Sequence, residues 1–129
     1  MKEQELFDWL KSNYYSDLTR SSKTFDHFDC TTDSLYIELK CRYTHYPDLL
    51  IEEIKYRRLV NEAGNLTPYY INSTPEGIFS FNLSKLPEPE WADKWMPTTT
   101  EFANTKKIMK KVGFLDISLA KRLDQISTS

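Results

Sequence analysis

Two kinds of side chain alternate over residues 35–42, and this pattern constrains the fold of the 129-residue chain more than any other feature. The odd positions are Leu, Ile, Leu and Cys, whereas the even positions are Tyr, Glu, Lys and Arg. Successive side chains of a β-strand point to opposite faces of the sheet, so a period of two predicts a strand with one apolar and one polar face. Glu38 and Lys40 then share the polar face, about 7 Å apart along the strand.

The first half of the chain predicts two helices around a hairpin. We expect a helix over residues 3–12, where apolar residues recur at helical spacing. A strand over residues 24–30 precedes the alternating strand, and residues 31–34, Thr-Thr-Asp-Ser, form the turn between them. Residues 47–61 begin with Pro-Asp, a pair that suits the first turn of a helix, and we expect a helix over this range.

The second half of the chain predicts another hairpin and a final helix. Strands over residues 69–72 and 78–83 turn at residues 74–77, Thr-Pro-Glu-Gly, where Pro and Gly occupy favoured turn positions. Residues 86–97 hold three of the six prolines, which indicates an ordered loop. The segment 98–113 opens with a capping box, Thr-x-x-Glu, and closes with Gly, a pattern that predicts a last long helix.

The predicted elements follow the order helix, hairpin, helix, hairpin, helix. That order is typical of an α/β fold, a sandwich in which a central mixed β-sheet is flanked by helices. A length of 129 residues fits one domain, which we expect to span residues 1–129.

Composition excludes several classes of protein. With 40% hydrophobic and 28% charged residues, the chain fits a folded protein and not a disordered one. No apolar run approaches the roughly 20 residues of a membrane span, and residues 1–5 lack the pattern of a signal peptide, so we expect a cytoplasmic protein with no membrane partner. The two cysteines and two histidines lack the spacing of a structural zinc site. Any metal would therefore be a hard ion held by carboxylates.

The net charge does not identify a partner by itself. The formal charge is −2, whereas proteins that bind phosphate backbones usually carry a basic excess. Positive residues nonetheless cluster at Lys55, Arg57 and Arg58, and again over residues 106–111, which hold four lysines. Such clusters occur both in nucleic-acid sites and on solvated helix faces, so a nucleic-acid partner stays open.

The polar face of the alternating strand suits metal-dependent hydrolysis. The preceding strand carries Asp26 and Asp29, so a carboxylate from each strand can meet beside Lys40. Two carboxylates with open coordination positions bind Mg²⁺ well, with Mn²⁺ as a substitute, because these ions prefer oxygen ligands. A lysine beside the ion can orient water and stabilise charge on a phosphoryl oxygen. Glu-x-Lys also occurs on the solvated face of many amphipathic strands, so the motif alone leaves both interpretations open.

Three segments of the chain match the motifs of a known family. They are residues 25–29 (Phe-Asp-His-Phe-Asp), 36–42 (Tyr-Ile-Glu-Leu-Lys-Cys-Arg) and 54–56 (Ile-Lys-Tyr). In these segments and their order the chain resembles the PD-(D/E)XK nuclease superfamily, which has the restriction-endonuclease-like fold, over about residues 1–83. It is also similar to small phage-encoded members, which would place it in the cytoplasm of the host. The chain departs from the motif where Phe, and not Pro, precedes the first acid.

The resemblance implies roles for several residues. Asp26 and Glu38 would be metal ligands, with the backbone carbonyl of Leu39 as a third ligand, and Lys40 would be the catalytic lysine. Some members add a glutamate from the first helix, for which Glu5 is the candidate. The resemblance also implies a homodimer, because many enzymes of this fold are dimers.

The identity of the first carboxylate depends on how the two strands pair. A register that sets Glu38 opposite His27 puts Asp29 on the Glu38 face, whereas a shift by one residue, or a bulge, puts Asp26 there. We prefer Asp26, because its twelve-residue gap to Glu38 fits the family pattern better than the nine-residue gap from Asp29. Asp29 stays the alternative.

Two basic residues are candidates for substrate binding. Lys55 shares a helix flank with apolar residues that face the sheet, so its ammonium group can reach a bound phosphate and assist catalysis. A surface lysine beside Glu52 is an equally good interpretation. Arg42 continues the polar face of the alternating strand, where it either binds the substrate backbone or is solvated.

The sequence therefore predicts a Mg²⁺-dependent nuclease, a hydrolase that cleaves phosphodiester bonds in DNA. The alternative is a catalytically inactive nuclease-like fold that binds nucleic acid or protein. Metal-dependent cleavage of a plasmid separates these two functions.

Overall fold

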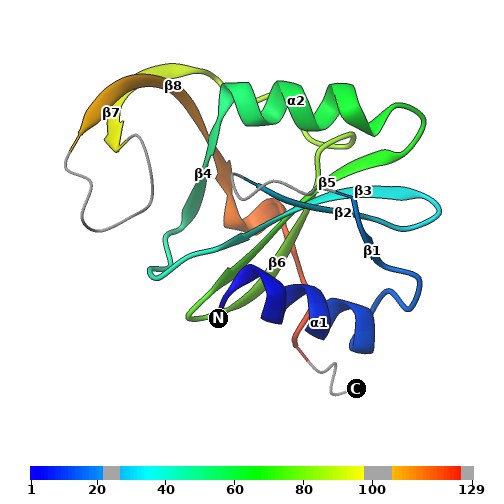
Figure 1. Ribbon diagram of the computed structural model, residues 1–129. Coiled ribbons are helices and arrows are strands. Elements are labelled where there is room, and N and C mark those ends of the chain that lie inside the picture. Colours follow the sequence, from blue (N-terminus) through cyan, green and yellow to red (C-terminus); the bar gives the residue numbers. More distant parts are fainter. Residues whose placement is uncertain (22–26, 98–105, 126–129) are drawn as a thin grey trace.

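In the computed structural model of the chain, a six-stranded β-sheet lies between two helices, and a three-stranded sheet extends from its side (Figure 1). The structure describes residues 1–21, 27–97 and 106–125. The central sheet is mixed, because β3 (Leu35–Cys41) and β5 (Thr67–Thr74) run parallel while the other neighbouring strands run antiparallel. The predicted α/β architecture with a mixed central sheet is confirmed.

Both predicted hairpins belong to the central sheet. β2 (Phe28–Thr31) pairs with β3 in the first hairpin, and β6 (Gly77–Asn82) pairs with β5 in the second. The short strands β1 (Thr19–Arg20) and β9 (Lys121–Arg122) form the two edges, which gives the order β1-β2-β3-β5-β6-β9. β3 therefore lies in the interior of the sheet, where its polar face can be buried.

Helix α1 (Glu3–Asn13) covers one face of the central sheet and confirms the predicted first helix. It buries Leu6 and Leu10 against a cluster that includes Ile37 and Leu39 of β3. Complete burial of one leucine side chain contributes about 2 kcal/mol. The apolar face of the alternating strand is thus the face that packs against α1.

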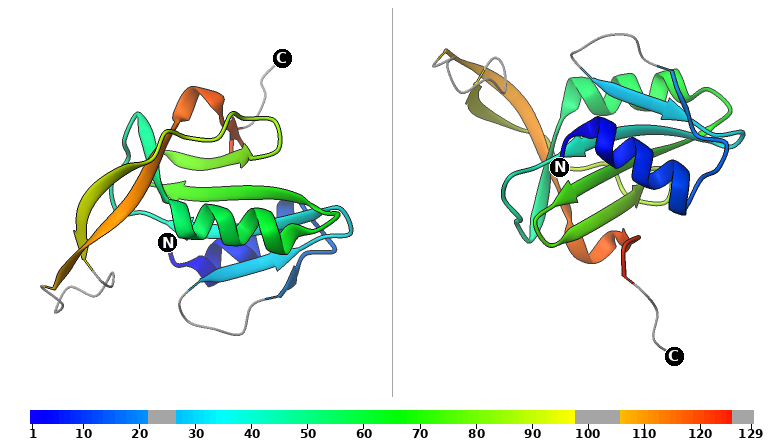
Figure 2. Two further views of the ribbon diagram at one scale, coloured as in Figure 1. Left: turned by 90° about the horizontal axis from the view of Figure 1, so that it is seen from above. Right: turned by 60° about the horizontal axis from the view of Figure 1, so that its bottom comes forward.

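Helix α2 (Glu53–Ala63) covers the opposite face, so that the sheet separates the two helices (Figure 2). Its buried residues Tyr56 and Leu59 pack in a second cluster with Tyr70 and Phe81 of the sheet. Because alternate residues of β3 point to opposite faces, the polar face of β3 lies on the α2 side. Of the charged residues of β3, Glu38 is therefore buried and Lys40 is half-buried.

The predicted helix over residues 47–61 is wrong in its first part. β4 (Asp48–Glu52) forms a strand there, with Leu49 and Ile51 buried and the other three residues more exposed. β4 pairs antiparallel with β8 (Lys107–Asp116), and the helix begins only at Glu53. The sequence signal of Pro-Asp marks the start of a strand because burial of two apolar side chains against β8 outweighs the local preference for a helix.

The predicted helix over residues 98–113 is also wrong where the structure describes it, because β8 begins at Lys107. Gly113 does not end a helix but lies within β8. A Cβ atom on Gly113 would lie 2.5 Å from Cβ of Pro89 and 3.0 Å from the ring of Trp91. The glycine therefore allows a neighbouring loop to pack closely on the strand, and such close packing is a common reason for glycine inside a strand.

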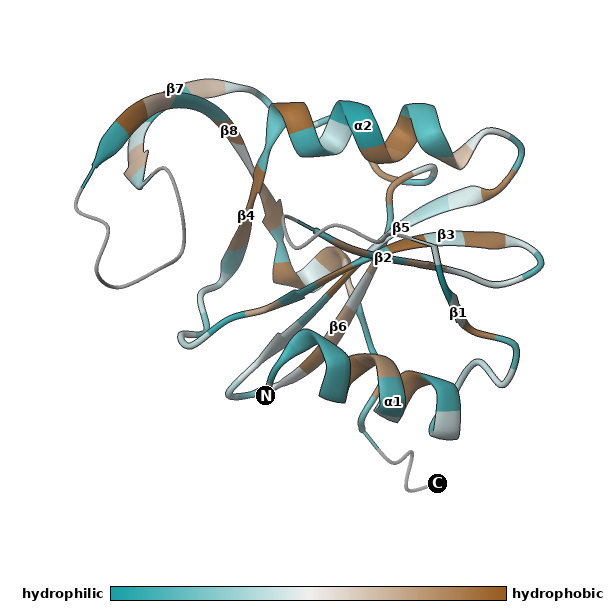
Figure 3. Cartoon of the chain, in the orientation of Figure 1, coloured by the Kyte–Doolittle hydropathy of each residue, from teal (hydrophilic) through white to brown (hydrophobic). Residues whose placement is uncertain are grey.

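The predicted loop over residues 86–97 ends in a strand as well. β7 (Ala92–Pro97) pairs antiparallel with β8, so the smaller sheet has the order β4-β8-β7. Strands β7 and β8 curve away from the body and carry hydrophobic as well as hydrophilic segments (Figure 3). Within the described residues, neither helix has the length and apolar character to cross a membrane.

Candidate active site

Asp29 and Glu38 face each other across the first hairpin. In the antiparallel pairing of β2 with β3, Asp29 is the direct partner of Glu38. Residues paired in this way project to the same face of a sheet, and here that face lies beneath α2. Both side chains are buried, with 0% of Asp29 and 4% of Glu38 exposed. Two buried acids need positive partners, because burial of an unpaired charge is costly.

Arg58 of α2 is the positive partner of both acids. Its Nη1 donates a hydrogen bond to Oδ2 of Asp29 at 2.5 Å, and its Nη2 donates to Oε1 of Glu38. Nη1 also lies 3.4 Å from Oε2 of Glu62, one turn further along α2. Burial alone would lower the pKa of Arg58, but the bond to Asp29 and the charge of Glu38 raise it. One guanidinium group thus bridges the two carboxylates.

Burial has a large effect on the pKa of Glu38. Burial raises the pKa of Glu38 to about 7, even though the positive charge of Arg58 opposes the rise. The negative charge of Asp29 raises the pKa further, while Lys55 and Lys40 lower it. Strongly shifted pKa values of this kind concentrate at functional sites, although buried ion pairs also cause them.

Lys40 follows Glu38 on the same face of β3 and is half-buried. Burial lowers the pKa of Lys40, and the nearby positive charges of Lys55 and Arg42 lower it further. The carboxylates of Glu3 and Glu38 act in the opposite direction. The charges of Glu3 and Glu38 thus act on Lys40, and its catalytic role stays a prediction.

Two buried polar atoms on the strands next to Glu38 and Lys40 lack a hydrogen-bond partner within the described residues. They are Oδ1 of Asp29 and Nδ2 of Asn72. Asn72 is fully buried and is the direct neighbour of Lys40 on β5, as Asp29 is the neighbour of Glu38 on β2. Folded proteins leave few buried polar groups unpaired, and those that remain often receive an ion, water or ligand. An open acceptor and an open donor thus flank Glu38 and Lys40.

Lys55 stands at the start of α2, close enough to affect the pKa of both Glu38 and Lys40. Its Nζ lies 3.2 Å from Oε2 of Glu52, and Oε1 of the same glutamate lies 2.9 Å from Nζ of Lys110. Lys55 therefore pairs with Glu52 and also lies near Asp29 and Glu38, which we call the acid pair. The role of Lys55 in phosphate binding stays a prediction.

Arg42 makes hydrogen bonds to neighbouring strands. Its Nε donates to Oδ1 of Asn72 at 2.6 Å, and its Nη2 donates to the carbonyl of Leu50 and to the hydroxyl of Tyr70. These bonds tie the end of β3 to β4 and β5. They indicate a structural role for Arg42. Its contact with substrate stays a prediction.

The remaining predicted residues differ in how they relate to the acid pair. Asp26 lies outside the described residues. Leu39 is buried with its side chain in the α1 cluster, and its carbonyl stays a predicted ligand. Glu5 is exposed and accepts a hydrogen bond from the backbone N–H of Lys2, whereas Glu3 is the glutamate of α1 whose charge acts on Lys40.

The donor set fits a divalent cation held by two carboxylates. Asp29 and Glu38 come within the span of one guanidinium group, and Oδ1 of Asp29 is an open acceptor. Among residues 1–21, 27–97 and 106–125, no group of three or more His, Cys, Asp or Glu side chains is arranged to hold a metal. Two carboxylates suffice for Mg²⁺, which commonly keeps several waters and takes its remaining ligands from substrate phosphates. Such an ion would share the two carboxylates with Arg58, which bonds to Oδ2 of Asp29 and Oε1 of Glu38.

Arg58, Asn72 and Tyr36 are part of the site but were not predicted to be. The hydroxyl of Tyr36 lies 2.9 Å from Oδ2 of Asp29 and 2.7 Å from Oε2 of Glu62. Helical spacing offered a signal for Arg58, because residue 58 is one turn beyond Lys55 and shares its flank. Asn72 interrupts a run of strand-forming residues, and a lone amide in such a run is a signal for a polar site.

The comparisons with known proteins identify the fold. No protein-family model matches the chain, and no curated protein has a significantly similar sequence. Among solved structures, the chain is similar to the 1.6 Å structure of Hjc, a Holliday junction resolvase from the archaeal hyperthermophile Archaeoglobus fulgidus. The TM-score is 0.54 at 18% sequence identity, over 93% of this chain and 92% of that chain. The chain has the restriction-endonuclease-like fold. The fold expected from the short motifs of residues 25–56 is thereby confirmed and extends over almost the whole chain.

Proposed function

We propose that this chain is a metal-dependent nuclease that hydrolyses phosphodiester bonds in DNA. The main support is the pair of open polar atoms, Oδ1 of Asp29 and Nδ2 of Asn72, on either side of Glu38 and Lys40. The fold adds support, because the similar structure is that of a Holliday junction resolvase. Mg²⁺ is the proposed cofactor, with Mn²⁺ as a substitute.

The proposed chemistry divides the work among four side chains. Asp29 and Glu38 hold the cation through oxygen atoms on one buried face of the sheet. When bound, the cation supplies positive charge at the phosphate and promotes ionisation of the attacking water. Lys40 stabilises negative charge on the phosphoryl oxygens, an effect that is strong because the side chain is half-buried. The amide of Asn72 donates its open N–H to water or to a phosphate oxygen.

Cleavage of defined DNA substrates tests this function. A four-way DNA junction and a linear duplex of the same sequence are incubated with the purified chain in Mg²⁺, in Mn²⁺ or in EDTA, and products are separated on denaturing gels. We expect cleavage of DNA in either cation and none in EDTA. Comparing the two substrates then shows whether the branch point is preferred.

A catalytically inactive nuclease-like fold is the second candidate, and Arg58 is the observation that favours it. Its guanidinium already bonds to both acids, an arrangement that can join α2 to the sheet without any cation. Calorimetric titration with Mn²⁺ in the absence of DNA separates the candidates. A chain that takes up no Mn²⁺ and cuts neither substrate, yet still binds DNA, is the inactive form.

We further propose Asp29, not Asp26, as the first carboxylate. The support is the register, in which Asp29 is the direct neighbour of Glu38. Asp29→Asn should then weaken Mn²⁺ binding at least tenfold, whereas Asp26→Asn should change it less than twofold, because loss of one charged ligand costs about 1.4 kcal/mol or more. The opposite order would assign the ligand to Asp26.

A further inference from the structure

A two-stranded ribbon projects from the body of the molecule. β4 pairs with β8 only over residues 112–116, whereas β7 pairs with residues 107–112. Residues 107–111 of β8 are therefore bonded to β7 alone. In Figures 1 and 2 this part of β7 and β8, which we call the arm (residues 92–97 and 107–111), curves away from the helices and the central sheet.

The arm exposes large apolar side chains. Trp95 is 62% exposed and lies directly opposite Met109, which is 48% exposed. Ile108 is 45% exposed and lies opposite Met96. A two-stranded hairpin without a covering layer is only marginally stable in water. These two pairs lie on opposite faces of the arm, and exposed apolar residues on both faces indicate a surface that a partner covers.

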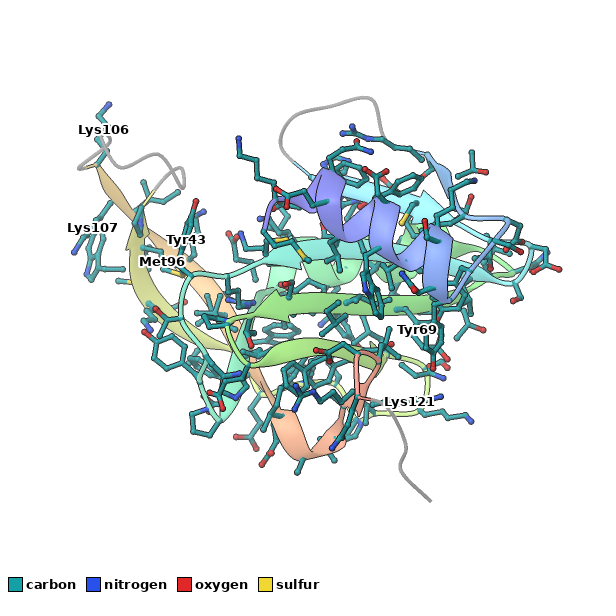
Figure 4. All side chains as sticks on the ribbon, turned by 90° about the horizontal axis from the view of Figure 1, so that it is seen from below. Tyr43, Tyr69, Met96, Lys106, Lys107 and Lys121 are labelled. Carbon is teal, nitrogen blue, oxygen red and sulfur yellow. The ribbon has the colours of Figure 1, made fainter. Side chains whose placement is uncertain are left out.

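The arm is also the basic part of a chain with an acidic balance. The arm contains four lysines against one acid, Asp93, a formal charge of +3. The whole chain carries −2, so the other residues together carry −5. Figure 4 shows Lys107 at the end of the molecule that is remote from Lys121. A partner that the arm attracts electrostatically must therefore be an anion.

The lysines lie on both faces of the arm. In the register of β7 with β8, Lys107 and Lys111 share a face with Trp95, whereas Lys94 and Lys110 are paired with each other on the opposite face. The major groove of B-form DNA admits a two-stranded β-ribbon and has a phosphate backbone along each wall. A ribbon with lysines on both faces can contact both backbones, and an exposed tryptophan can pack on sugars or bases.

We propose that the arm binds the DNA duplex that the active site cleaves. This inference rests on the proposed function and names the surface that holds its substrate. Glu52 connects the two regions, because it pairs with Lys110 at the base of the arm and with Lys55 beside Glu38 and Lys40. Two copies of the arm would repel each other through their lysines, which favours DNA over a second arm as the occupant.

DNA binding in the absence of divalent cations tests the arm separately from cleavage. Fluorescence anisotropy with a labelled 30-bp duplex is measured in EDTA over a range of salt concentrations. The triple variant K94Q/K107Q/K111Q removes three exposed lysines and spares Lys110, which pairs with Glu52. We expect affinity at low salt to fall about tenfold or more and the slope of log K against log salt to decrease by about 2 to 3.

The variant K2Q/K85Q/K121Q is the matched control, because it removes three exposed lysines that lie outside the arm. It should bind DNA within about threefold of the parent chain. Trp95→Phe should abolish the DNA-induced change in tryptophan fluorescence while circular dichroism stays unchanged. An arm variant that loses cleavage but still binds DNA normally would contradict DNA binding by the arm, because its defect would then lie in the active site.

Two results would overturn the inference. One is an affinity and salt slope of the arm variant equal to those of the control variant, which would assign DNA binding to another surface. The other is self-association of the chain in sedimentation velocity that Trp95→Ser abolishes without change in DNA binding. That result would make a second copy of the chain, and not DNA, the partner that covers the arm.

Discussion

The acid pair and the arm use charged residues in opposite ways. Asp29 and Glu38 are buried beneath α2, and Arg58 of the same chain pairs with both of them. The lysines of the arm are mostly exposed, and they lie beside apolar side chains that nothing in the described chain covers. The first region already has an internal partner that a cation would compete with, whereas the second region has no covering partner within the described residues.

This difference determines how each region responds to mutation and to salt. Buried charges interact in a medium of low polarity, so loss of one group leaves another unpaired at a cost of several kcal/mol. The charges of exposed lysines are screened by salt over about 10 Å, and each lysine adds only a small amount to the binding free energy. We expect large effects that do not depend on salt at the acid pair, and small effects that do depend on it at the arm.

The largest expected effect is loss of cleavage on substitution at the charged face of β3. Glu38→Ala and Lys40→Ala should each lower kcat by about 10²- to 10³-fold or more, because each removes charge that acts on the transition state. Single-turnover cleavage of the DNA junction in Mg²⁺ measures this. DNA binding in EDTA should stay within about threefold, which separates these variants from the arm variant. Retention of wild-type cleavage by either variant would remove that residue from the site.

Arg58→Gln should alter metal binding and stability in opposite directions. If the guanidinium competes with the cation for Asp29 and Glu38, Mn²⁺ should bind about tenfold more tightly to the variant, since one charge-assisted bond to the acids is lost. In EDTA the variant should be less stable by roughly 3 kcal/mol, because two buried acids lose their partner. Mn²⁺ should then raise the Tm of the variant more than that of the parent.

Arg57→Gln is the control, since Arg57 pairs with Glu53 and Glu88 at the surface. It should leave Mn²⁺ affinity unchanged in the same titration. Weaker Mn²⁺ binding by Arg58→Gln would mean that Arg58 positions the carboxylates for the ion and does not compete with it. In that case the acid pair, like the arm, would have no internal competitor for its partner.

The raised pKa of Glu38 predicts how stability depends on pH in EDTA. A carboxyl group with a folded-state pKa of about 7 binds its proton more tightly in the folded chain than in the unfolded chain. Its contribution is complete below the ordinary value of 4.5 and is lost as pH rises through about 7. Relative to Glu38→Gln, the parent chain should lose about 1 kcal/mol per pH unit between pH 5 and 7 in urea unfolding. Parallel pH profiles of the two chains would contradict burial as the cause.

Sequence patterns predicted the parts of the fold that depend on periodicity within one segment. The alternation over residues 35–42 gave a strand with Glu38 and Lys40 on one face, and the apolar spacing near the N-terminus gave α1. These features follow from the geometry of a single strand or helix, which a sequence encodes directly. The short motifs around Asp29 and Glu38 were enough to indicate the fold that the comparison confirms.

What the sequence did not predict depends on contacts between distant segments. The five residues of β4 form a strand because they pair with residues 112–116 of β8. Residues 107–112 of β8 form a strand because they pair with β7. The local signals of β4 and of residues 107–112 favoured helices. The direct pairing of Asp29 with Glu38 depends on register, which shifts with the position of a turn. Arg58 reaches the acid pair from α2, which begins six residues later than expected.

The smallest expected effect joins the two regions and concerns Lys55. If its ammonium group reaches a bound phosphate, Lys55→Ala should weaken DNA binding severalfold, lower cleavage, and reduce the salt slope by about one contact, while Mn²⁺ affinity stays unchanged. The reason is that a lysine acts on phosphate as a point charge, whereas the carboxylates alone hold the ion. Arg57→Ala is the control, since residue 57 lies about 200° from residue 55 around the helix. Equal losses in both variants would mean that α2 attracts DNA only diffusely, and the region between acid pair and arm would then have no dedicated phosphate contact.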